Sequence, residues 1–490
     1  GAANYQIPIA VPPGTAGMQP SLSLTYNSRS GNGILGVGWT LGGLSFITRC
    51  PATKVVVGFI DGVDFDDNDR FCIDGQRLIQ VTGTTGQYVD DGIEYRTEVE
   101  GFTQVISYDT DSSNNGPEYF IAKTKSGQIL EYGNTADSRI EAQSKTDMRL
   151  WAVNKISDTV GNYLNEDGTN GTYTPAQIDY TGNASATPQL SPYASVVFEY
   201  EIRSDITHLY MYGSLIKNTE RLTHIKSYVG TTLGRDHVLT YDNDGAANRS
   251  RLTQLQECDG QTTPECFSPL VFDWQEGGEG TFQAKTNHLI EGGSWSQAYQ
   301  EYIDINADGY PDWLYIGTTK RWIALSNGDG TFQAKTNHNI EGGTWSQAYQ
   351  QYVDIDGNGL VDWIWKGTTK RWIALSNDPI QDLNVGIGNG LDTNTLIAHI
   401  PLTDSSVYTK GISATYPEID IQDPVYVVSS VDVDDGAGGT RTTTYHYTGA
   451  KSSLDGRGFL GFASMAATNT STGITTTTTY QQAHPPPVSG

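Results

Sequence analysis

Short runs of alternating apolar and polar residues recur along most of the chain. In Ser21–Tyr26 and Ser195–Glu201 apolar side chains occupy every second position, and Gly, Asn, Asp and Pro residues separate such runs. A period of two between turn residues is typical of β-strands that bury one face. We therefore predict an all-β protein, with a β-sandwich or barrel-like domain over residues 1–275.

One segment of this pattern occurs twice. Residues 279–328 align with residues 329–378 at a step of 50, and 36 of the 50 aligned positions are identical. Each copy has about four short strand-like runs, as a propeller blade does. We expect residues 276–380 to form two blade-like units. Because a closed propeller needs at least about four blades, either other segments supply degenerate blades or the two units form an open array capped by neighbours.

Each copy contains an acidic loop between two strand-like runs. Oxygen-bearing side chains stand at positions 1, 3, 5 and 9 of both loops, with glycine at position 6. Calcium takes about six to eight oxygen ligands, and the glycine permits the sharp turn that gathers them. We predict two Ca²⁺ sites, with the backbone carbonyl of position 7 as a further ligand. The ligands are Asp304, Asn306, Asp308, Tyr310 and Asp312 in the first loop, and Asp354, Asp356, Asn358, Leu360 and Asp362 in the second.

These loops differ from a helical EF-hand. Position 12 holds Tyr315 or Trp365 where a bidentate glutamate is required, and the run Asp312–Ile316 alternates as a strand does. The alternative to calcium is a metal-free hairpin turn rich in Asp, Asn and Gly. A further acidic stretch, Asp64–Asp69, lacks the glycine, and we expect a solvated turn there.

The acidic composition narrows the possible partners. A formal net charge of −26 argues against nucleic acid, whose phosphates would be repelled, and favours cation binding. No apolar run reaches the length of about 18 residues that a transmembrane segment needs. The cysteines allow three disulfide pairings or four buried thiols, so they leave the compartment open: Cys50, Cys72, Cys258 and Cys266.

The N-terminal region has an unusual composition. A proline-rich run, Ile7–Pro20, precedes the glycine-dense Asn32–Leu44, which we expect to be a tightly packed turn region. Three stretches resemble the SpvB-like domain that begins the B component of insecticidal toxin complexes (Tc toxins) and related Rhs-type polymorphic toxins: Val11–Asn27, Gly36–Trp39 and Asp69–Leu78. The acidic repeats resemble VCBS or FG-GAP repeats, whose loops bind calcium in bacterial surface proteins.

The remainder of the chain extends this resemblance. Residues 381–480 are similar to the middle region of the same toxin B components, where a strand-rich Rhs shell begins, and residues 481–490 are expected to be a flexible proline-rich tail. Because such relatives usually continue much further, the chain resembles a shortened member or an N-terminal part. Strands at an open sheet edge leave N–H and C=O groups unpaired. We expect the C-terminal strands to fold back on the N-terminal domain or to pair with another chain.

The sequence shows none of the common catalytic frames. Gly-x-Ser-x-Gly, His-Glu-x-x-His and phosphate-binding loops are all missing. In the families that the chain resembles, activity lies in a separate C-terminal effector such as an ADP-ribosyltransferase. We therefore expect no catalytic residue, no cofactor other than Ca²⁺, and a chain that is not an enzyme.

Seven of the ten tryptophans lie in the repeats. Indole faces beside calcium can bind sugars, but they can equally hold neighbouring sheets together, and packing is the favoured role. The candidates are Trp295, Trp313, Trp322, Trp345, Trp363 and Trp372, with Trp365 as the seventh.

Two functional hypotheses follow from these features. The first is a secreted, non-enzymatic scaffold of a toxin complex or Rhs-type toxin, which helps to enclose or dock an effector and contacts the pore-forming component. The second is a calcium-dependent extracellular adhesin or lectin that acts through its Trp-rich repeats.

Overall fold

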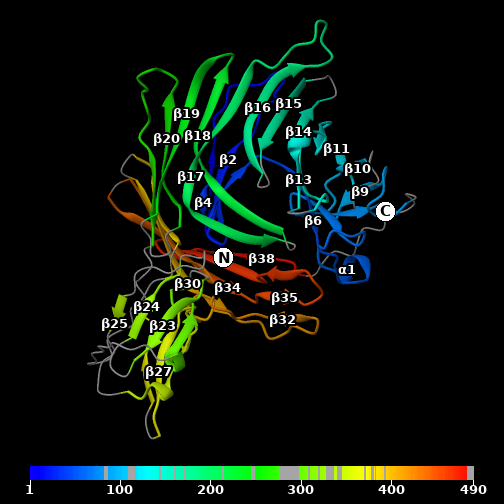
Figure 1. Ribbon diagram of the computed structural model, residues 1–490. Coiled ribbons are helices and arrows are strands. Elements are labelled where there is room, and N and C mark those ends of the chain that lie inside the picture. The colour runs from blue at the N-terminus through cyan, green and yellow to red at the C-terminus, as the bar shows by residue number, and fades with distance from the viewer. Residues whose placement is uncertain are drawn as a thin grey trace.

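The computed structural model confirms an almost entirely β architecture (Figure 1). It describes residues 1–81, 86–108, 116–142, 145–158, 162–169, 173–211, 214–243, 249–275, 297–306, 310–317, 321–326, 336–338, 345–368, 371–376, 380, 382–390, 393–436 and 438–482. Most of the predicted tail, residues 483–490, lies outside these ranges. No helix in the described part of the chain is long and apolar enough to cross a membrane.

Eight strands between residues 46 and 157 form an antiparallel barrel. The strands are hydrogen-bonded in chain order, and β14 closes the ring because it pairs with both β12 and β6. They are β6 (Phe46–Cys50), β7 (Arg70–Ile73), β8 (Gln76–Gln80), β9 (Glu94–Thr97), β10 (Gln104–Tyr108), β11 (Tyr119–Lys123), β12 (Ile129–Tyr132) and β14 (Met148–Ser157). The short helix α1 (Lys54–Val57), the 3₁₀ turn η1 (Ala136–Ser138) and β13 (Arg139–Glu141) lie between them in sequence. The barrel-like prediction for this region is confirmed.

Side chains fill the barrel, so its interior is a core and not a channel. Phe71, Phe120 and Trp151 meet edge to face, with ring centroids 5.1 to 5.5 Å apart. Beside them Arg49 Nη1 donates to Asp69 Oδ2 at 2.7 Å, and both side chains are fully buried. Arg49 therefore neutralises the last carboxylate of the acidic stretch Asp64–Asp69, which reduces the charge available there for a cation.

A second, longer sheet starts at the same strand β14. Its strands are antiparallel neighbours throughout. After β14 they are β15 (Asn162–Thr169), β16 (Thr174–Asn183), β17 (Ala194–Met211), β18 (Ser214–Val229), β19 (Thr232–Asp242), β20 (Arg251–Asp259), β21 (Leu270–Trp274), β29 (Asn384–Gly388), β30 (Asn394–Pro401), β33 (Tyr426–Asp434), β34 (Thr440–Thr448), β37 (Ser464–Asn469) and β38 (Thr475–Thr479). We call this the long sheet.

The N-terminal strands pack on one face of the long sheet. They are β1 (Asn4–Pro8), β2 (Ser23–Asn27) and β5 (Trp39–Gly42), with the small hairpin of β3 (Asn32–Gly33) and β4 (Gly36–Val37). Trp39 contacts Phe272 with ring centroids 4.8 Å apart, inside a core that both layers share. At Gly36, where φ is +80°, a Cβ would lie 2.4 Å from the Ser250 carbonyl oxygen. The expected tight packing of this glycine-dense stretch is confirmed, because only glycine fits here.

The two repeats are inserted between neighbouring strands of the long sheet. The chain leaves at β21 and returns at β29, and these two strands pair, with Phe272 opposite Ile387. Each repeat forms a small sheet, and we call these sheets blade 1 and blade 2. Blade 1 contains β22 (Gln300–Ile303), β23 (Asp312–Ile316), β24 (Arg321–Ala324) and β25 (Thr336–His338). Blade 2 contains β26 (Gln350–Val353), β27 (Asp362–Lys366) and β28 (Arg371–Ala374). The 3₁₀ turns η2 (Gln297–Tyr299) and η3 (Gln347–Tyr349) precede them, and both blades project from one end of the molecule (Figure 1).

The C-terminal strands fold back towards the N-terminal region. A small sheet of β32 (Glu418–Asp420), β35 (Lys451–Ser453) and β36 (Gly458–Gly461) lies beside them, and β31 (Tyr408–Thr409) runs parallel to β34. Arg457 forms an ion pair with Glu98 of the barrel, and the Arg29 guanidinium lies 5.6 Å from the centre of the Phe459 ring. The edge strand β38 keeps one side unpaired within the described residues, and all of its side chains are exposed.

Candidate metal centre and the repeat interface

The second acidic loop, between β26 and β27, gathers its carboxylates as the sequence predicts. Carboxylate oxygens of Asp354, Asp356 and Asp362 lie within 4.8 Å of one another. Asn358 and Leu360 belong to the same turn, in which the Leu360 N–H donates to Asn358 Oδ1 at 2.8 Å. The glycine at position 6, Gly359, has a φ of +88°, as the predicted sharp turn requires.

The position-9 aspartate anchors the loop to its blade. The fully buried Asp362 accepts backbone N–H groups from Ile355 at 2.8 Å and from Ser376 at 2.7 Å. In blade 1 Asp312 repeats both bonds, to Ile305 at 3.0 Å and Ser326 at 2.8 Å. One carboxylate thus joins the loop to the end of the third strand in each blade.

The donor set fits a hard divalent cation. Besides burial, the negative charges of Asp362 and Asp354 raise the pKa of the Asp356 carboxyl group. A cation placed among these oxygens would relieve that repulsion, and carboxylate, amide and carbonyl oxygens are the ligands that calcium takes. Asp354 accepts N–H groups from Gly357, Asn358 and Gly359, at 2.7 to 3.1 Å, and these hydrogen bonds hold the loop in shape without a metal.

The same loop contacts the long sheet, which the sequence did not predict. Thr403, just after β30, donates its hydroxyl to the Gly357 carbonyl oxygen. Burial, followed by the charges of Asp356 and Asp354, raises the pKa of Tyr426 in β33 to about 12. The second acidic loop, which we call loop 2, therefore lies at the junction between blade 2 and the rest of the protein.

The first loop is described in part. Asp304, Asn306, Tyr310 and Asp312 lie in described residues, and the Asn306 side chain is buried. Asp308 lies outside them, so the complete ligand set of this loop stays a prediction.

In the described part of the repeats, the tryptophan side chains contribute more to packing than to the exposed surface. Trp363 is fully buried, and Trp345 contacts the rings of Trp363, Trp365 and Trp372 with centroids 5.5, 4.9 and 6.0 Å apart. Trp313 and Trp322 are half-buried, Trp372 is 37% exposed, and Trp295 lies outside the described residues. Sugar binding by these residues stays untested.

A buried arginine stands at the contact between the blades. Arg321 of blade 1 lies over Tyr352 and Trp363 of blade 2, 5.1 and 5.3 Å from their ring centres. Burial lowers the pKa of its guanidinium to about 10, still high enough to keep the charge at neutral pH. The sequence gives no signal for this site, because Arg321 and Arg371 have the same local sequence and nothing in it shows which copy is covered.

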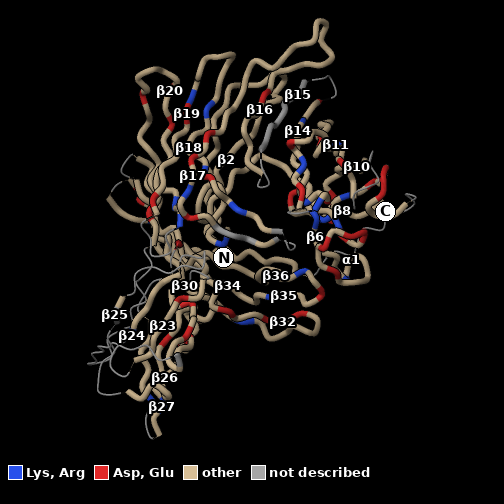
Figure 2. The backbone as a smooth tube through the Cα atoms, in the orientation of Figure 1, with Lys and Arg blue, Asp and Glu red and all other residues tan. Residues whose placement is uncertain are grey.

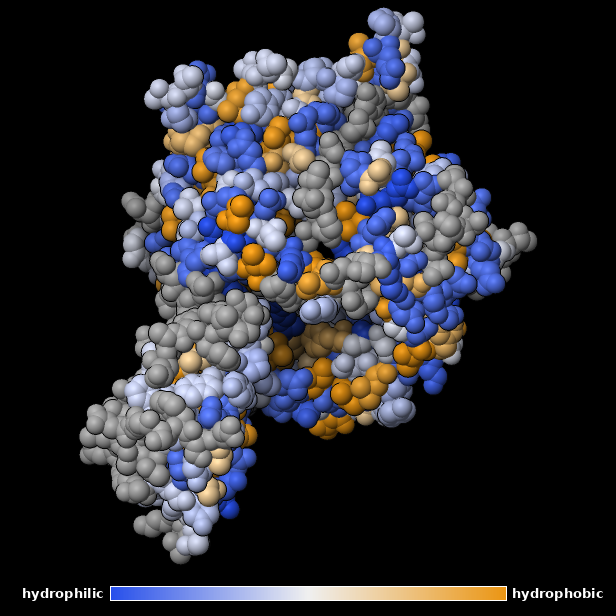
Figure 3. Space-filling model, in the orientation of Figure 1, coloured by the Kyte–Doolittle hydropathy of each residue, from blue (hydrophilic) through white to orange (hydrophobic). Residues whose placement is uncertain are grey.

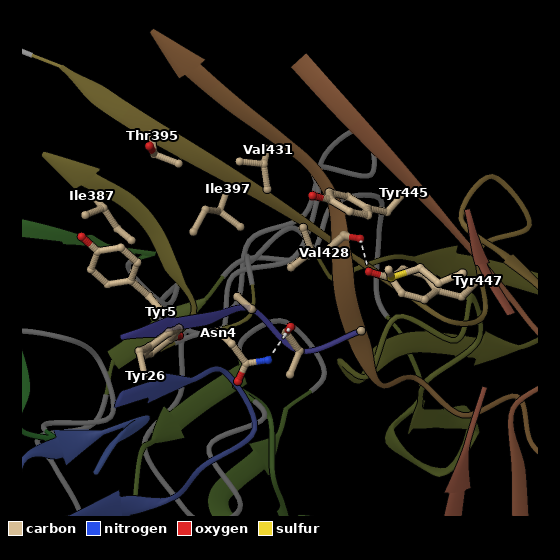
Figure 4. A pocket seen from close by; sticks show the side chains of 14 residues that line it. Asn4, Tyr5, Tyr26, Ile387, Thr395, Ile397, Val428, Val431, Tyr445 and Tyr447 are labelled. Atoms are coloured by element: carbon tan, nitrogen blue, oxygen red, sulfur yellow. Dashed lines mark hydrogen bonds between the residues drawn. The ribbon is translucent and has the colours of Figure 1, made fainter. Parts of the chain in front are cut away.

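A cavity of about 350 Å³ separates the N-terminal strand from the C-terminal half of the long sheet. Figure 4 shows Tyr5 and Tyr26 on one side and Val428, Val431 and Tyr445 on the other. Burial raises the pKa of Tyr26 to about 12, so its hydroxyl stays protonated at neutral pH. The described lining is mainly apolar, and no carboxylate, imidazole or thiol is among its residues, which are the groups that acid–base chemistry uses most.

Charge and hydropathy are mixed over the visible surface. Figure 2 shows basic residues interspersed with acidic ones along the barrel and the long sheet. In Figure 3 apolar and polar residues alternate over the same face, which is hollowed between the long strands and the C-terminal strands. The described residues in this view show no basic stripe of the kind that marks a nucleic-acid-binding surface.

Two family models match this chain. Residues 1–213 match "Salmonella virulence plasmid 65kDa B protein", the SpvB family, and residues 304–365 match the FG-GAP-like repeat. The chain is 26% identical over 206 residues to the mono(ADP-ribosyl)transferase SpvB of Salmonella typhimurium, and 25% identical over 206 residues to that of Salmonella enteritidis. Each alignment covers 37% of this chain and 32% of the relative, so the chain matches about a third of their length.

These relatives correct one expectation from the sequence. We expected a chain that is not an enzyme, because no catalytic frame is present, but the curated relatives are named mono(ADP-ribosyl)transferases. The shared segment is the SpvB domain at the N-terminal end of this chain. A missing motif in the residues given does not decide whether a protein is an enzyme, since these relatives are named as enzymes and share only the N-terminal segment with this chain.

Solved toxin structures share the fold of nearly the whole chain. The crystal structure of TcdB2-TccC3-Cdc42 matches with a TM-score of 0.77 at 13% identity, covering 98% of this chain and 36% of that one. The Tc holotoxin pore of Photorhabdus luminescens matches with a TM-score of 0.58 at 14% identity, covering 98% and 35%. The predicted resemblance to SpvB-like, FG-GAP and Tc toxin sequences is confirmed: the family models match within the expected SpvB-like and repeat regions, and nearly the whole chain shares the fold of part of a Tc toxin component.

Proposed function

We propose that this chain is an assembly module of a secreted toxin complex or Rhs-type polymorphic toxin, which helps to enclose or dock an effector and contacts a translocating component. The observation that carries the proposal is the long sheet, which continues from β14 to β38 in the fold of a Tc toxin component. Because neighbouring strands satisfy each other's backbone groups, such a sheet can serve as a continuous wall.

Two further features support an extracellular assembly role. Disulfides join Cys50 to Cys72 in the barrel and Cys258 of β20 to Cys266, which follows that strand, and such bonds persist in oxidising compartments. The repeats leave and re-enter the long sheet through paired strands, so they can carry a docking surface without interrupting the wall. We assign the enclosing role to the long sheet and the docking role to the blades.

The proposal is tested by reconstitution with two purified proteins from the same genome, a pore-forming component and an effector-bearing component. We expect a stable complex with the effector-bearing protein in size-exclusion chromatography with light scattering, and slower digestion of the effector by protease inside that complex. Binding to neither protein, at concentrations up to tens of micromolar typical of weak complexes, would overturn the proposal.

We further propose that each acidic loop binds one Ca²⁺ ion and that the ion in loop 2 stiffens the junction between blade 2 and the long sheet. The gathered oxygens of Asp354, Asp356 and Asp362 support the first statement. The contact between Thr403 and Gly357 supports the second, because it joins the loop to the segment after β30. Isothermal titration of the calcium-free protein should give two sites, and heat signals that fit no binding would contradict this assignment.

A further inference from the structure

The cavity between the N-terminal strands and the C-terminal half of the long sheet is bounded by two layers that touch at its margins. At one margin the Val428 N–H donates to the Gly1 carbonyl oxygen at 3.0 Å, and at another the Asn384 N–H donates to the Tyr26 hydroxyl at 2.9 Å. Gly1, Val428 and Tyr26 also line the cavity, which has a volume of about 350 Å³. The two layers are therefore joined around a space that their own side chains do not fill.

Strand register places an apolar face on the sheet side of this space. Ile397 of β30 pairs with Val431 of β33, and directly opposite residues share a face. A shift of register after Ala398 leaves one extra residue in β33, so Val428 lies on the same face as Val431. Figure 4 shows Ile397, Val428 and Val431 on the side of the sheet that faces the N-terminal strand.

The lining favours an uncharged, mainly apolar molecule. None of the described lining residues is Asp, Glu, Lys, Arg or His. The Tyr447 hydroxyl donates to the Val428 carbonyl oxygen at 3.0 Å, whereas the hydroxyls of Tyr5 and Tyr445 have no hydrogen-bond partner among the described residues. A charged group would lose its hydration here without a compensating partner. A neutral ring system can instead pack against the tyrosine rings and exchange a hydrogen bond with a free hydroxyl.

The space is accessible to such a molecule and large enough for it. Tyr5, Ile397, Val431 and Tyr445 line the cavity and are only half-buried, although they lie between two layers. An apolar ligand would remove this surface from water, which stabilises a complex by about 25 cal/mol per Å². Because an apolar cavity of about 150 Å³ holds benzene, the volume of this cavity is sufficient for a molecule of two or three rings.

We propose that this cavity binds a neutral, mainly apolar small molecule of two or three rings, which contacts both layers. The bound molecule touches β1 on one side and β30 and β33 on the other, so it stabilises the packing of the N-terminal strands on the long sheet. This site is separate from the acidic loops, and it does not depend on the assembly role proposed above.

A fluorescence titration of the full chain with N-phenylnaphthylamine tests this proposal, since this neutral probe fluoresces more strongly in apolar surroundings. We expect one saturable site with a dissociation constant on the order of micromolar. Ile397→Trp fills the cavity and should weaken binding at least about tenfold. The matched control is Leu396→Trp, on the opposite face of the same strand and 55% exposed, and it should bind like the wild type.

Further measurements separate this site from general apolar surface. Anilinonaphthalenesulfonate, which adds a sulfonate to the same ring system, should bind at least about tenfold more weakly. Saturating N-phenylnaphthylamine should raise the melting temperature of the wild type and of Leu396→Trp, but not that of Ile397→Trp. Val431→Phe fills less of the cavity and should weaken binding even if Ile397→Trp does not fold. No saturable binding, equal binding of both probes, or wild-type binding by the folded cavity variants would each overturn the proposal.

Discussion

The third strands of the two blades, β24 and β28, have the same sequence, Arg-Trp-Ile-Ala, and different surroundings. In β24 Arg321 and Ile323 are buried beneath blade 2, whereas in β28 Arg371 and Ile373 face solvent. The backbone hydrogen bonds are the same, since Trp313 pairs with Ala324 as Trp363 pairs with Ala374. Strand formation in these repeats is therefore local, but the stability that each side chain adds depends on whether another sheet covers it.

The largest expected contrast comes from a charge placed at the isoleucine of each copy. Ile323→Asp puts a carboxylate into the core between the blades and should lower the free energy of unfolding of the repeats by about 3–5 kcal/mol. Ile373→Asp, the matched control, should change it by less than about 0.5 kcal/mol. Urea unfolding followed by tryptophan fluorescence measures both, because most tryptophans lie in the repeats. Equal losses for the two variants would show that Ile323 and Ile373 are covered to the same extent.

Calcium removal should destabilise both blades, whereas an aspartate in place of the isoleucine should be strongly destabilising in only one of the two copies. At a calcium concentration about 100 times the dissociation constant, binding to the folded state adds about 2.7 kcal/mol for each site. A chelator should therefore lower the melting temperature of the wild type. The double variant Asp304→Ala/Asp354→Ala should melt at one temperature with or without chelator.

The control for the calcium prediction is Asp64→Ala, in the acidic stretch that Arg49 partly neutralises. This exposed residue should leave the calcium dependence of melting unchanged. A wild-type melting curve that is the same in calcium and in chelator would remove the basis for both metal sites.

The arginines give a smaller contrast of the same kind. A desolvated cation over aromatic rings contributes on the order of 2 kcal/mol, and its aliphatic stem adds packing. Arg321→Ala should therefore destabilise the repeats by about 2 kcal/mol, while Arg371→Ala should stay within about 0.5 kcal/mol in the monomer. Chemical denaturation at low protein concentration measures the free energy of unfolding of both variants. An equal loss for Arg371→Ala and Arg321→Ala would argue against the different burial of the two arginines.

The smallest expected effect is a pH dependence of stability that comes from the long sheet and not from the blades. Burial lowers the pKa of His399 in β30 from 6.5 to about 4, and neither ring nitrogen has a hydrogen-bond partner among the described residues. Between these values the unfolded chain binds the proton and the folded chain does not, so stability falls as pH decreases from 6.5 towards 4. The loss between pH 6.5 and 5 should be about 1 kcal/mol, since the side chain is only partly enclosed.

His399→Phe is the variant that tests this pH dependence. In urea titrations at pH 6.5, 5.5 and 5, this variant should show a smaller change in the free energy of unfolding with pH than the wild type. It should not change how the effects of the isoleucine and arginine substitutions in the blades depend on pH. A variant whose profile keeps the wild-type slope would exclude His399 as its source.

The sequence by itself determined the strand-rich class, the duplicated unit, the spacing of oxygen-bearing residues in the acidic loops and the resemblance to SpvB and Tc toxin components. These features are local, because a period of two, a glycine at φ +88° and a fixed order of Asp and Asn residues are properties of neighbouring residues. Loop 2 accordingly brings Asp354, Asp356 and Asp362 together as expected. The anchoring bonds of Asp362 to Ile355 and Ser376 had no comparable signal in the sequence.

Only the tertiary structure decided which strand edges and faces meet. The closure of the barrel by β14 on β6, the pairing of β21 with β29 across the inserted repeats, and the contact of Thr403 with loop 2 all join residues that are distant in sequence. The same holds for Arg321 and Arg371, whose local sequences are identical. Whether a side chain is buried depends on its neighbours as much as on the residue itself. A repeated sequence therefore does not show which of its copies another sheet covers.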